Sequence, residues 1–348
     1  MRIIKNIEST SVGKTRIKND DGIYIGTNFA AVIDGVSSKS SIIVNGKKVR
    51  IADIIIDAIK KIDNDNAPKY AKEFDLDEFL KIINMYISKY CEKFGISLKD
   101  NKLEATGAIY SKYNNQIWII GDCRAVYDGK QITNDLEADE LYTKIRIEII
   151  NSLLKQGYTI QDIFENDVSV DIINNPDTCT EYIQDEKEAN RIKEFIKDQM
   201  HMALLETGFD EEQIISENLL STFYKPQILQ EYSKNNPNAK KYGYSVFNGI
   251  YTPTKWCKVE SLPDKVKKIK LSTDGFPIDI LNYSKDLGQA IRRNKKLTKI
   301  DPISIKENIG IHNSVIKNEE YIMNDDESAI DIMIEEVKKE KVKEELEK

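Results

Sequence analysis

Four acidic positions along the chain have the residue types and spacing of a cation-binding site. Asp34 and Asp274 each follow an apolar, strand-like run and precede a glycine. A strand end holds such a carboxylate rigidly and leaves it open to solvent. Mg²⁺ and Mn²⁺ prefer oxygen ligands of this kind, and with only two histidines in the chain a zinc site is not expected. Two acidic pairs complete the set: Asp20-Asp21 and Asp325-Asp326.

The hydrophobic pattern predicts the elements that must position these acids. Apolar runs at 2–7 and 23–33 predict two strands, the second of which ends at Asp34-Gly35. Apolar residues at three-to-four spacing predict helices over 51–62 and 76–90. The remaining expected elements are a hairpin over 108–122, strands at 124–127, 242–251, 256–259, 266–272 and 329–334, and a helix over 284–296.

The middle of the chain has a different character. Residues 136–232 are rich in Glu, Lys, Ile and Leu and predict an inserted helical subdomain, with helices near 137–156, 186–207 and 211–232. The segment 335–348 is dominated by Glu and Lys, which is typical of a solvated helix or a frayed tail. Strands at both ends with helices gathered between them favour an α+β fold.

Composition excludes several classes of protein. The 348 residues carry 51 Lys+Arg and 58 Asp+Glu, a net charge of −7, with 40% hydrophobic residues, as in globular domains. The acidity and the absence of a Lys/Arg stripe argue against a nucleic-acid partner. No signal-peptide-like or membrane-spanning apolar run occurs, so we expect a cytoplasmic protein with no membrane partner. The four cysteines form no C-x-x-C pair and are expected to be reduced, mostly buried thiols.

Six motifs carry a family resemblance. In the order of the chain they are Arg16–Asp21 (RIKNDD), Phe29–Gly35 (FAAVIDG), Glu104–Ala108 (EATGA), Ile120–Val126 (IGDCRAV), Leu271–Gly275 (LSTDG) and Asn324–Ser328 (NDDES). Together they resemble the metal-dependent protein phosphatases of the type 2C, or PPM, family. The resemblance covers roughly residues 1–130 and 240–336, and the helical stretch between them has no counterpart in the usual family pattern.

The resemblance implies a particular architecture. It is a four-layer αββα sandwich of two antiparallel sheets flanked by helices, with two divalent cations, Mn²⁺ or Mg²⁺, in the cleft between the sheets. The phosphatase-like domain would span 1–336, include the helical insert 136–232, and be followed by a charged tail, 337–348. The insert would either select substrates and gate the cleft or be a packed decoration without a functional role.

The resemblance also implies a role for each acidic motif. Asp34 would bridge both metals, and Asp274 with Asp325 would complete one of the two coordination sites. The other site would be completed by Asp20 and the carbonyl of Gly35. Asp21 would bind a water held by a metal, and Arg16 would hold the phosphate, for which a planar, two-pronged cation is well suited.

The expected function is that of a metal-dependent phosphomonoester hydrolase, foremost a serine/threonine protein phosphatase. Water activated between two metals would attack phosphorus in line, without a covalent intermediate. The expected substrate is a protein carrying phosphoserine or phosphothreonine, with a small phosphorylated metabolite as a second option. The alternative is a catalytically weak or inactive binding or regulatory module on the phosphatase fold.

Several positions depart from the family pattern. Val36 stands where many members have a histidine after Asp-Gly, a candidate proton donor. The acid that binds a third metal in some members falls on Asn101, so no third metal is expected. Cys123 replaces the common serine of the Gly-Asp-Ser-Arg motif, which we interpret as structural. His201 and His312 belong to no motif and are expected to be ordinary surface or core residues.

One further stretch resembles part of a phosphate-binding loop. Gly13-Lys14-Thr15 resembles the end of such a loop, with Asp122 as its metal partner. The required glycine five residues earlier is Glu8, which would place negative charge against phosphates, so a nucleotide-binding enzyme is disfavoured.

Overall fold

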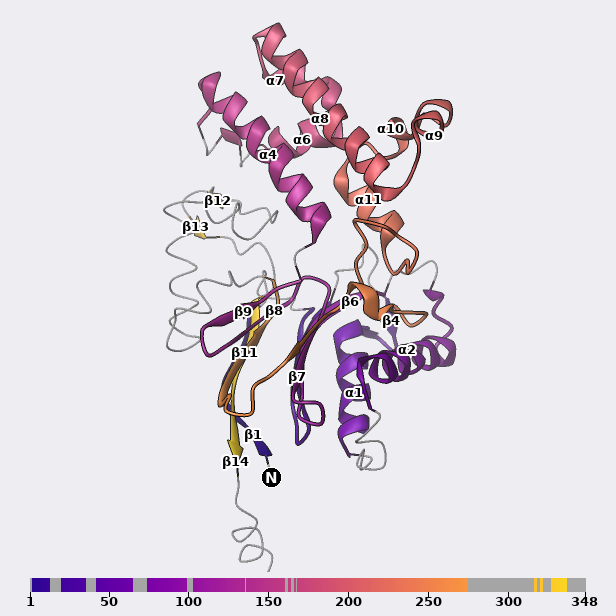
Figure 1. The fold of residues 1–348 in the computed structure, drawn as a ribbon, viewed down its shortest axis with the longest axis vertical. Coiled ribbons are helices and arrows are strands. Elements are labelled where there is room, and N and C mark those ends of the chain that lie inside the picture. The colour runs from indigo at the N-terminus through magenta and orange to yellow at the C-terminus, as the bar shows by residue number, and fades with distance from the viewer. Residues whose placement is uncertain are drawn as a thin grey trace, which may run out of the picture. The chain divides into compact units, whose positions relative to one another are not determined.

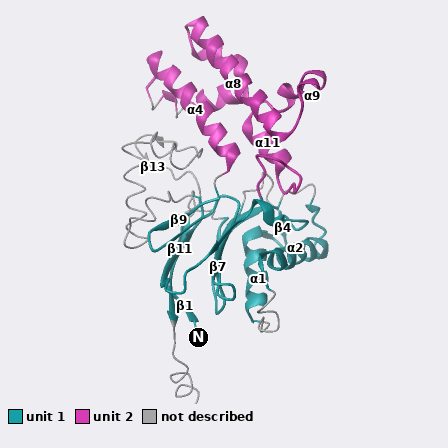
Figure 2. Cartoon of the chain, in the orientation of Figure 1, with its two compact units in different colours: residues 1–134, 245–294, 325–348 teal, residues 135–244, 295–324 magenta. Residues whose placement is uncertain are grey.

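The chain divides into two compact units. The computed structural model describes residues 2–12, 20–35, 42–64, 74–98, 103–134, 136–159, 162–163, 166, 168–274, 316–317, 320–321 and 327–336. Residues 1–134, 245–294 and 325–348 form the two-sheet unit, and residues 135–244 with 295–324 form the helical unit (Figure 2). Within the described ranges, every helix is too short or too polar to cross a membrane.

The two-sheet unit contains two five-stranded antiparallel sheets (Figure 1). This finding confirms the predicted α+β fold class with two antiparallel sheets. The first sheet has the order β1 (Arg2–Val12), β14 (Glu327–Glu336), β11 (Lys268–Ser272), β8 (Arg124–Tyr127), β9 (Lys130–Ile132). The second has the order β10 (Lys258–Ser261), β7 (Gln116–Ile120), β6 (Ala105–Ser111), β3 (Phe29–Gly35), β2 (Gly22–Ile25). This unit also contains the short pair of β4 (Ile43–Val44) with β5 (Lys47–Lys48), whereas the pair of β12 (Ile316–Lys317) with β13 (Glu320–Tyr321) belongs to the helical unit.

Strand β3 is buried on both faces, and its side chains alternate between two cores. Phe29, Ala31 and Ile33 belong to a cluster beneath the helices. Ala30 and Val32 belong to the cluster that fills the space between the sheets. A short, continuous apolar run is typical of a strand covered on both sides, and it fixes the position of Asp34 at the end of the strand.

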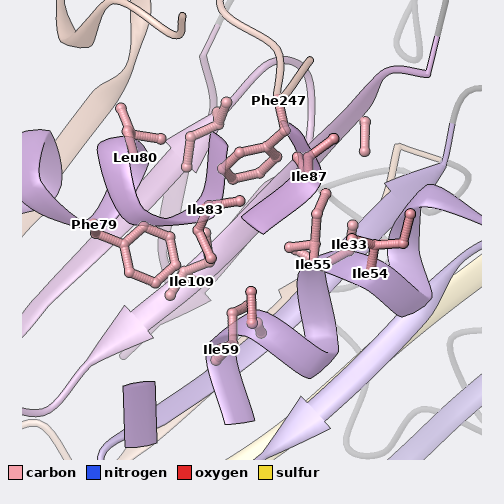
Figure 3. Packing of buried hydrophobic residues seen from close by; sticks show 14 of the residues in the cluster. Ile33, Ile54, Ile55, Ile59, Phe79, Leu80, Ile83, Ile87, Ile109 and Phe247 are labelled. Carbon is pink, nitrogen blue, oxygen red and sulfur yellow. The ribbon is translucent and has the colours of Figure 1, made fainter. Parts of the chain in front are cut away.

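Helices α1 (Ile51–Asn64) and α2 (Leu76–Lys93) cover the second sheet, as their apolar periodicity predicts. Ile55, Ile59 and Ile83 pack with Ile109 and Phe247 in this layer (Figure 3). The Asp75 side chain caps α2 by accepting from the backbone N–H of Glu78. The helix predicted over 284–296 lies outside the described residues.

The prediction of one strand over 23–33 was wrong, because two strands and a turn occupy this stretch. The Gly26 N–H donates to the Phe29 carbonyl at 2.8 Å and closes the turn between β2 and β3. The Asp63 carboxylate accepts from the Asn28 backbone N–H at 2.9 Å and from the Tyr24 hydroxyl at 2.9 Å. The partner that fixes the turn therefore comes from α1, which local periodicity could not reveal.

The prediction of a strand over 242–251 was also wrong. This stretch makes only an isolated bridge, between Phe247 and Ala105. The buried Asn84 amide of α2 holds the following loop instead, accepting from the Gly249 N–H at 2.9 Å and donating to the Thr252 hydroxyl at 2.9 Å. Strand β10 begins at Lys258, two residues later than predicted, after a 3₁₀ turn at 254–256.

The helical unit has a core of its own. The helices predicted near 137–156 and 186–207 are confirmed, whereas the pattern over 211–232 is divided among three short helices, because Asn218 adopts a left-handed φ of 49° and Pro226 starts a new helix. Two helices, α6 and α7, were not predicted. The elements are α4 (Glu137–Lys155), α6 (Val168–Asn174), the 3₁₀ turn η2 (Pro176–Thr178), α7 (Cys179–Tyr182), α8 (Glu186–Thr207), α9 (Glu211–Ser216), α10 (Leu219–Thr222) and α11 (Pro226–Ser233).

Candidate metal centre

Three of the acidic motifs meet where strands of both sheets end. Asp34 and Gly35 close β3, and Asp20-Asp21 directly precede β2. Strands β2 and β3 are antiparallel, with Gly22 opposite Ile33, so the two motifs lie at the same end of the sheet. Asp274 follows β11 of the other sheet.

Gly35 is the point of closest approach between two of these motifs. A Cβ atom at this position would lie 2.4 Å from the backbone carbonyl oxygen of Asp20. Real Cβ atoms do not approach a backbone oxygen this closely, so only glycine allows the contact. The glycine of the Asp-Gly dipeptide is therefore needed to bring Asp20 against the end of β3.

Asp34 lies next to a carboxylate that we did not predict as part of the site. One ligand atom each of Asp34, Asp122 and Cys123 lies within 4.8 Å of the others. Asp122 belongs to the connection from β7 to β8, where Gly121 has a φ of +77° that favours glycine. The Thr106 hydroxyl donates to Asp122 Oδ1 at 3.0 Å and orients this carboxylate.

Hydrogen bonds connect the remaining two acidic positions. The Thr273 hydroxyl donates to Asp21 Oδ2 at 3.3 Å, which links the end of β11 to the start of β2. Arg124 Nη1 donates to the backbone carbonyl of Asp274 at 3.2 Å. These contacts place Asp21 and Asp274 at the same end of the sandwich.

Three acids at this end of the sandwich are buried, and Asp34 and Asp122 are half-buried. Asp20, Asp21 and Asp274 are only 6%, 3% and 3% exposed. Burial raises the pKa of the Cys123 thiol well above its ordinary value, and the negative charges of Asp34, Asp122 and Asp274 raise it further.

Two basic side chains lie beside the Asp20-Asp21 pair. Lys48 Nζ is 2.5 Å from Asp20 Oδ1, and Arg50 Nη1 donates to the Asp21 carbonyl at 3.5 Å. The pKa of Arg50 is raised, first by its hydrogen bond to Asp53 and also by the charges of Asp20 and Asp21. Buried carboxylates repel one another unless cations offset their charge, and this end of the sandwich attracts cations.

Two predicted site residues, Arg16 and Asp325, lie outside the described residues. They stand four residues after the end of β1 and two residues before the start of β14. These strand ends pair with each other, Val12 opposite Glu327. The Thr273 N–H donates to the Ser328 carbonyl at 2.9 Å and joins the start of β14 to the Asp274 segment. Val36, Asn101 and His312 also lie outside the described residues.

Asp122 is the site residue that sequence reasoning missed. A signal was present, since the apolar strand β7 ends two residues before Asp122, just as the apolar run of β3 ends at Asp34. The Gly-Asp-Cys-Arg motif was interpreted as structural instead. Cys123 is fully buried, as expected, but its sulfur adjoins the carboxylates and contacts the Thr106 hydroxyl at 3.4 Å.

The other residues singled out from the sequence lie elsewhere. His201 is in α8 of the helical unit and contacts Glu211 at 3.1 Å. All four cysteines are free, as predicted; Cys91, Cys123 and Cys179 are buried and Cys257 is half-buried.

Comparison with known proteins returns solved structures of phosphatases. No protein-family model and no curated sequence matches the chain. The catalytic domain of the serine/threonine protein phosphatase PstP, in complex with two manganese ions, is 13% identical with a TM-score of 0.42, over 97% of this chain and 100% of that one. The PPM phosphatase MsPP from Mycobacterium smegmatis is 12% identical with a TM-score of 0.39, over 94% and 98% of the two chains. Stp1 from Staphylococcus aureus is 13% identical with a TM-score of 0.39, over 94% of each chain. All three of these solved structures are serine/threonine phosphatases.

Proposed function

We propose that the protein is a metal-dependent phosphomonoester hydrolase that acts on phosphoserine or phosphothreonine in proteins. The observation that carries the proposal is the meeting of Asp34 and Asp122 beside the Cys123 sulfur, at the end of the sandwich where Thr273 joins Asp21 to the Asp274 segment. These carboxylates come from distant motifs and from both sheets. A cluster of buried and half-buried like charges is a costly arrangement unless it binds cations.

The residues present fit a pair of divalent ions. The donor set is carboxylate and carbonyl oxygen, which Mg²⁺ and Mn²⁺ prefer. The Lys48 ammonium on Asp20 shows that the cluster already holds a positive charge at one of its oxygens. We propose Asp34 as the bridging ligand, Asp274 and Asp325 as ligands of one ion, and Asp20 with the Gly35 carbonyl as ligands of the other.

The chain's own residues would position the substrate for in-line attack. The chemistry that two divalent cations supply in such centres is charge on the phosphoryl oxygens and a nucleophile at neutral pH. Arg16 would bind the phosphoryl group through two parallel hydrogen bonds. Asp21 would orient water by accepting its hydrogen bond. Because Asp20, Asp21 and Asp274 are buried, their interactions are stronger than they would be in water.

We propose a phosphatase-like domain over 1–336 that carries the insert 136–232, followed by the tail 337–348. For the insert we propose that it selects substrates or gates the cleft. The cytoplasm is the proposed location, where thiols such as the four free cysteines stay reduced.

The test is hydrolysis of an aryl phosphate by the purified chain with Mn²⁺, with Mg²⁺ or with a chelator. We expect metal-dependent release of phosphate, reduced at least about 100-fold in Asp34→Asn and Asp274→Asn because each removes a ligand charge. Asp128→Asn is the matched control, since Asp128 also precedes a glycine but lies exposed in the turn between β8 and β9. Phosphate release that is unchanged by a chelator would contradict the proposal. An absence of release with either metal would also contradict it and would favour the alternative of a binding module.

A further inference from the structure

A lysine on a short hairpin lies where a cation would bind Asp20. Strands β4 and β5 are joined by Asn45-Gly46, both with positive φ, as in a tight two-residue turn. Neighbouring side chains of β5 alternate in exposure, so that Lys47 is exposed and Lys48 is half-buried. The Lys48 Nζ atom lies 2.5 Å from Asp20 Oδ1.

The hairpin is fixed in a way that directs Lys48 inward. The Val49 N–H donates to the Ile42 carbonyl at 2.8 Å and closes the hairpin at its base. Val49 is buried in the core beneath the helices, and Ile42 and Val44 pack against that core. Because these neighbours are packed against the core, the Lys48 side chain lies beside the Asp20 carboxylate. It is 28% exposed.

Asp20 has little freedom to move away from this ammonium. Its side chain is 9% exposed, and its backbone carbonyl lies against Gly35 with no space for even a methyl group. An ammonium within hydrogen-bond distance of a carboxylate oxygen repels a divalent cation that binds the same oxygen. Even through the other oxygen, the two positive charges would repel each other at short range.

We propose that Lys48 is a built-in cation that competes with the divalent ion at Asp20. This inference rests on the proposed function. In the absence of metal, Lys48 offsets part of the charge of the cluster. An ion that binds at the Asp20 and Gly35 side meets the positive charge of Lys48 unless the Lys48 side chain moves away. This position therefore fills only at a higher metal concentration than it would without Lys48.

The test is a titration of the substrate-free, full-length protein with Mn²⁺. The amount of Mn²⁺ that stays unbound is measured from the electron paramagnetic resonance signal of the free aqueous ion. We expect Lys48→Gln to tighten Mn²⁺ binding at one of the two sites by about fivefold, the equivalent of one ion pair at the upper end of the exposed range. Lys47→Gln is the matched control, because it removes the same charge from the adjacent, exposed position, and it should bind as the wild type does. Thermal unfolding provides a second readout: the rise in Tm on adding Mn²⁺ should be larger for Lys48→Gln than for the wild type.

The outcomes separate this inference from the proposed function. Unchanged or weaker Mn²⁺ binding by Lys48→Gln, with two ions still bound by the wild type, would overturn the competition while leaving the metal centre in place. If Lys47→Gln tightened Mn²⁺ binding as much as Lys48→Gln does, the effect would be one of net charge, and this result would also overturn the competition. If no variant binds Mn²⁺, both the inference and the proposed function fail.

Discussion

Thr106 shows how a single side chain joins two motifs of the chain. It lies in the Glu104–Ala108 motif, and its hydroxyl donates to Asp122 of the Ile120–Val126 motif at 3.0 Å. A Cβ on Gly121 would lie 2.2 Å from the Thr106 methyl group, so the glycine and the threonine are fitted to each other. Both motifs thereby place one carboxylate beside Asp34.

We predict that Asp122→Asn weakens metal binding without unfolding the protein. The amide keeps the oxygen that accepts from Thr106 but removes a negative charge next to Asp34. The Mn²⁺ concentration for half-maximal phosphate release should rise about 10-fold or more. An unchanged Mn²⁺ dependence, measured beside Asp128→Asn, would mean that Asp122 only supports the turn.

Among the single residues of the candidate site, the sequence predicted those that lie at the end of a buried strand. Asp34 and Asp274 could be singled out because an apolar run fixes where each strand ends. Lys48 could not, because its role depends on a hairpin of two-residue strands and on the position of Asp20, 28 residues earlier. Neither hydrophobic periodicity nor any sequence motif indicates that Lys48 and Asp20 lie close together.

Among the elements, helices α4 and α8 are joined by a charged network. Glu188 accepts from Arg191 at 2.7 Å and from the Ser152 hydroxyl at 2.9 Å, and Arg191 also pairs with Glu148 at 2.8 Å. The hydrogen bond from Arg191, followed by that from Ser152, lowers the pKa of Glu188 from 4.5 to about 2. The ionised form of Glu188 is therefore favoured in the folded protein.

We predict a pH-dependent loss of stability in Glu188→Gln. Because the pKa of Glu188 is lower in the folded protein than in the unfolded chain, its ionised form stabilises the fold above pH 4.5. This contribution is lost as the pH falls from 4.5 toward 2. At pH 7 the Tm of the variant should be about 1–3 °C below that of the wild type. The difference should shrink between pH 5 and pH 3. Asp198→Asn, an exposed position of α8, is the control, and a difference that stays constant with pH would contradict the assignment.

Elements with strong periodicity were predictable, and those held by distant partners were not. Helices α1, α2, α4 and α8 carry their own amphipathic pattern. The stretch 242–251 is apolar enough to resemble a strand, yet the amide of Asn84, more than 160 residues away in sequence, holds its loop instead. Such tertiary override of local propensity is the usual reason for a wrong strand prediction.

In the whole molecule, the carboxylate cluster belongs to one unit only. All of its described residues lie in the two-sheet unit, whereas the core of the helical unit is formed by side chains from residues 138–242. A ligand stabilises the structure that binds it. Metal binding is therefore expected to act on the two units unequally.

We predict that Mn²⁺ slows hydrogen exchange in the two-sheet unit and leaves the helical unit unchanged. At a free concentration of about 100 Kd, the binding unit should gain about 2.7 kcal/mol of stability. Exchange measured by mass spectrometry should slow in peptides from β3 and β11 and stay constant in peptides from α4 and α8. Equal slowing in both units would show that they unfold together.

The most direct measurement is a crystal structure of the protein soaked in Mn²⁺, with the ions located by anomalous scattering. We expect two peaks between the sheets, both within coordinating distance of Asp34 and one of them also of Asp274. Peaks far from these carboxylates, or an absence of peaks at saturating Mn²⁺, would contradict the metal centre and with it the phosphatase.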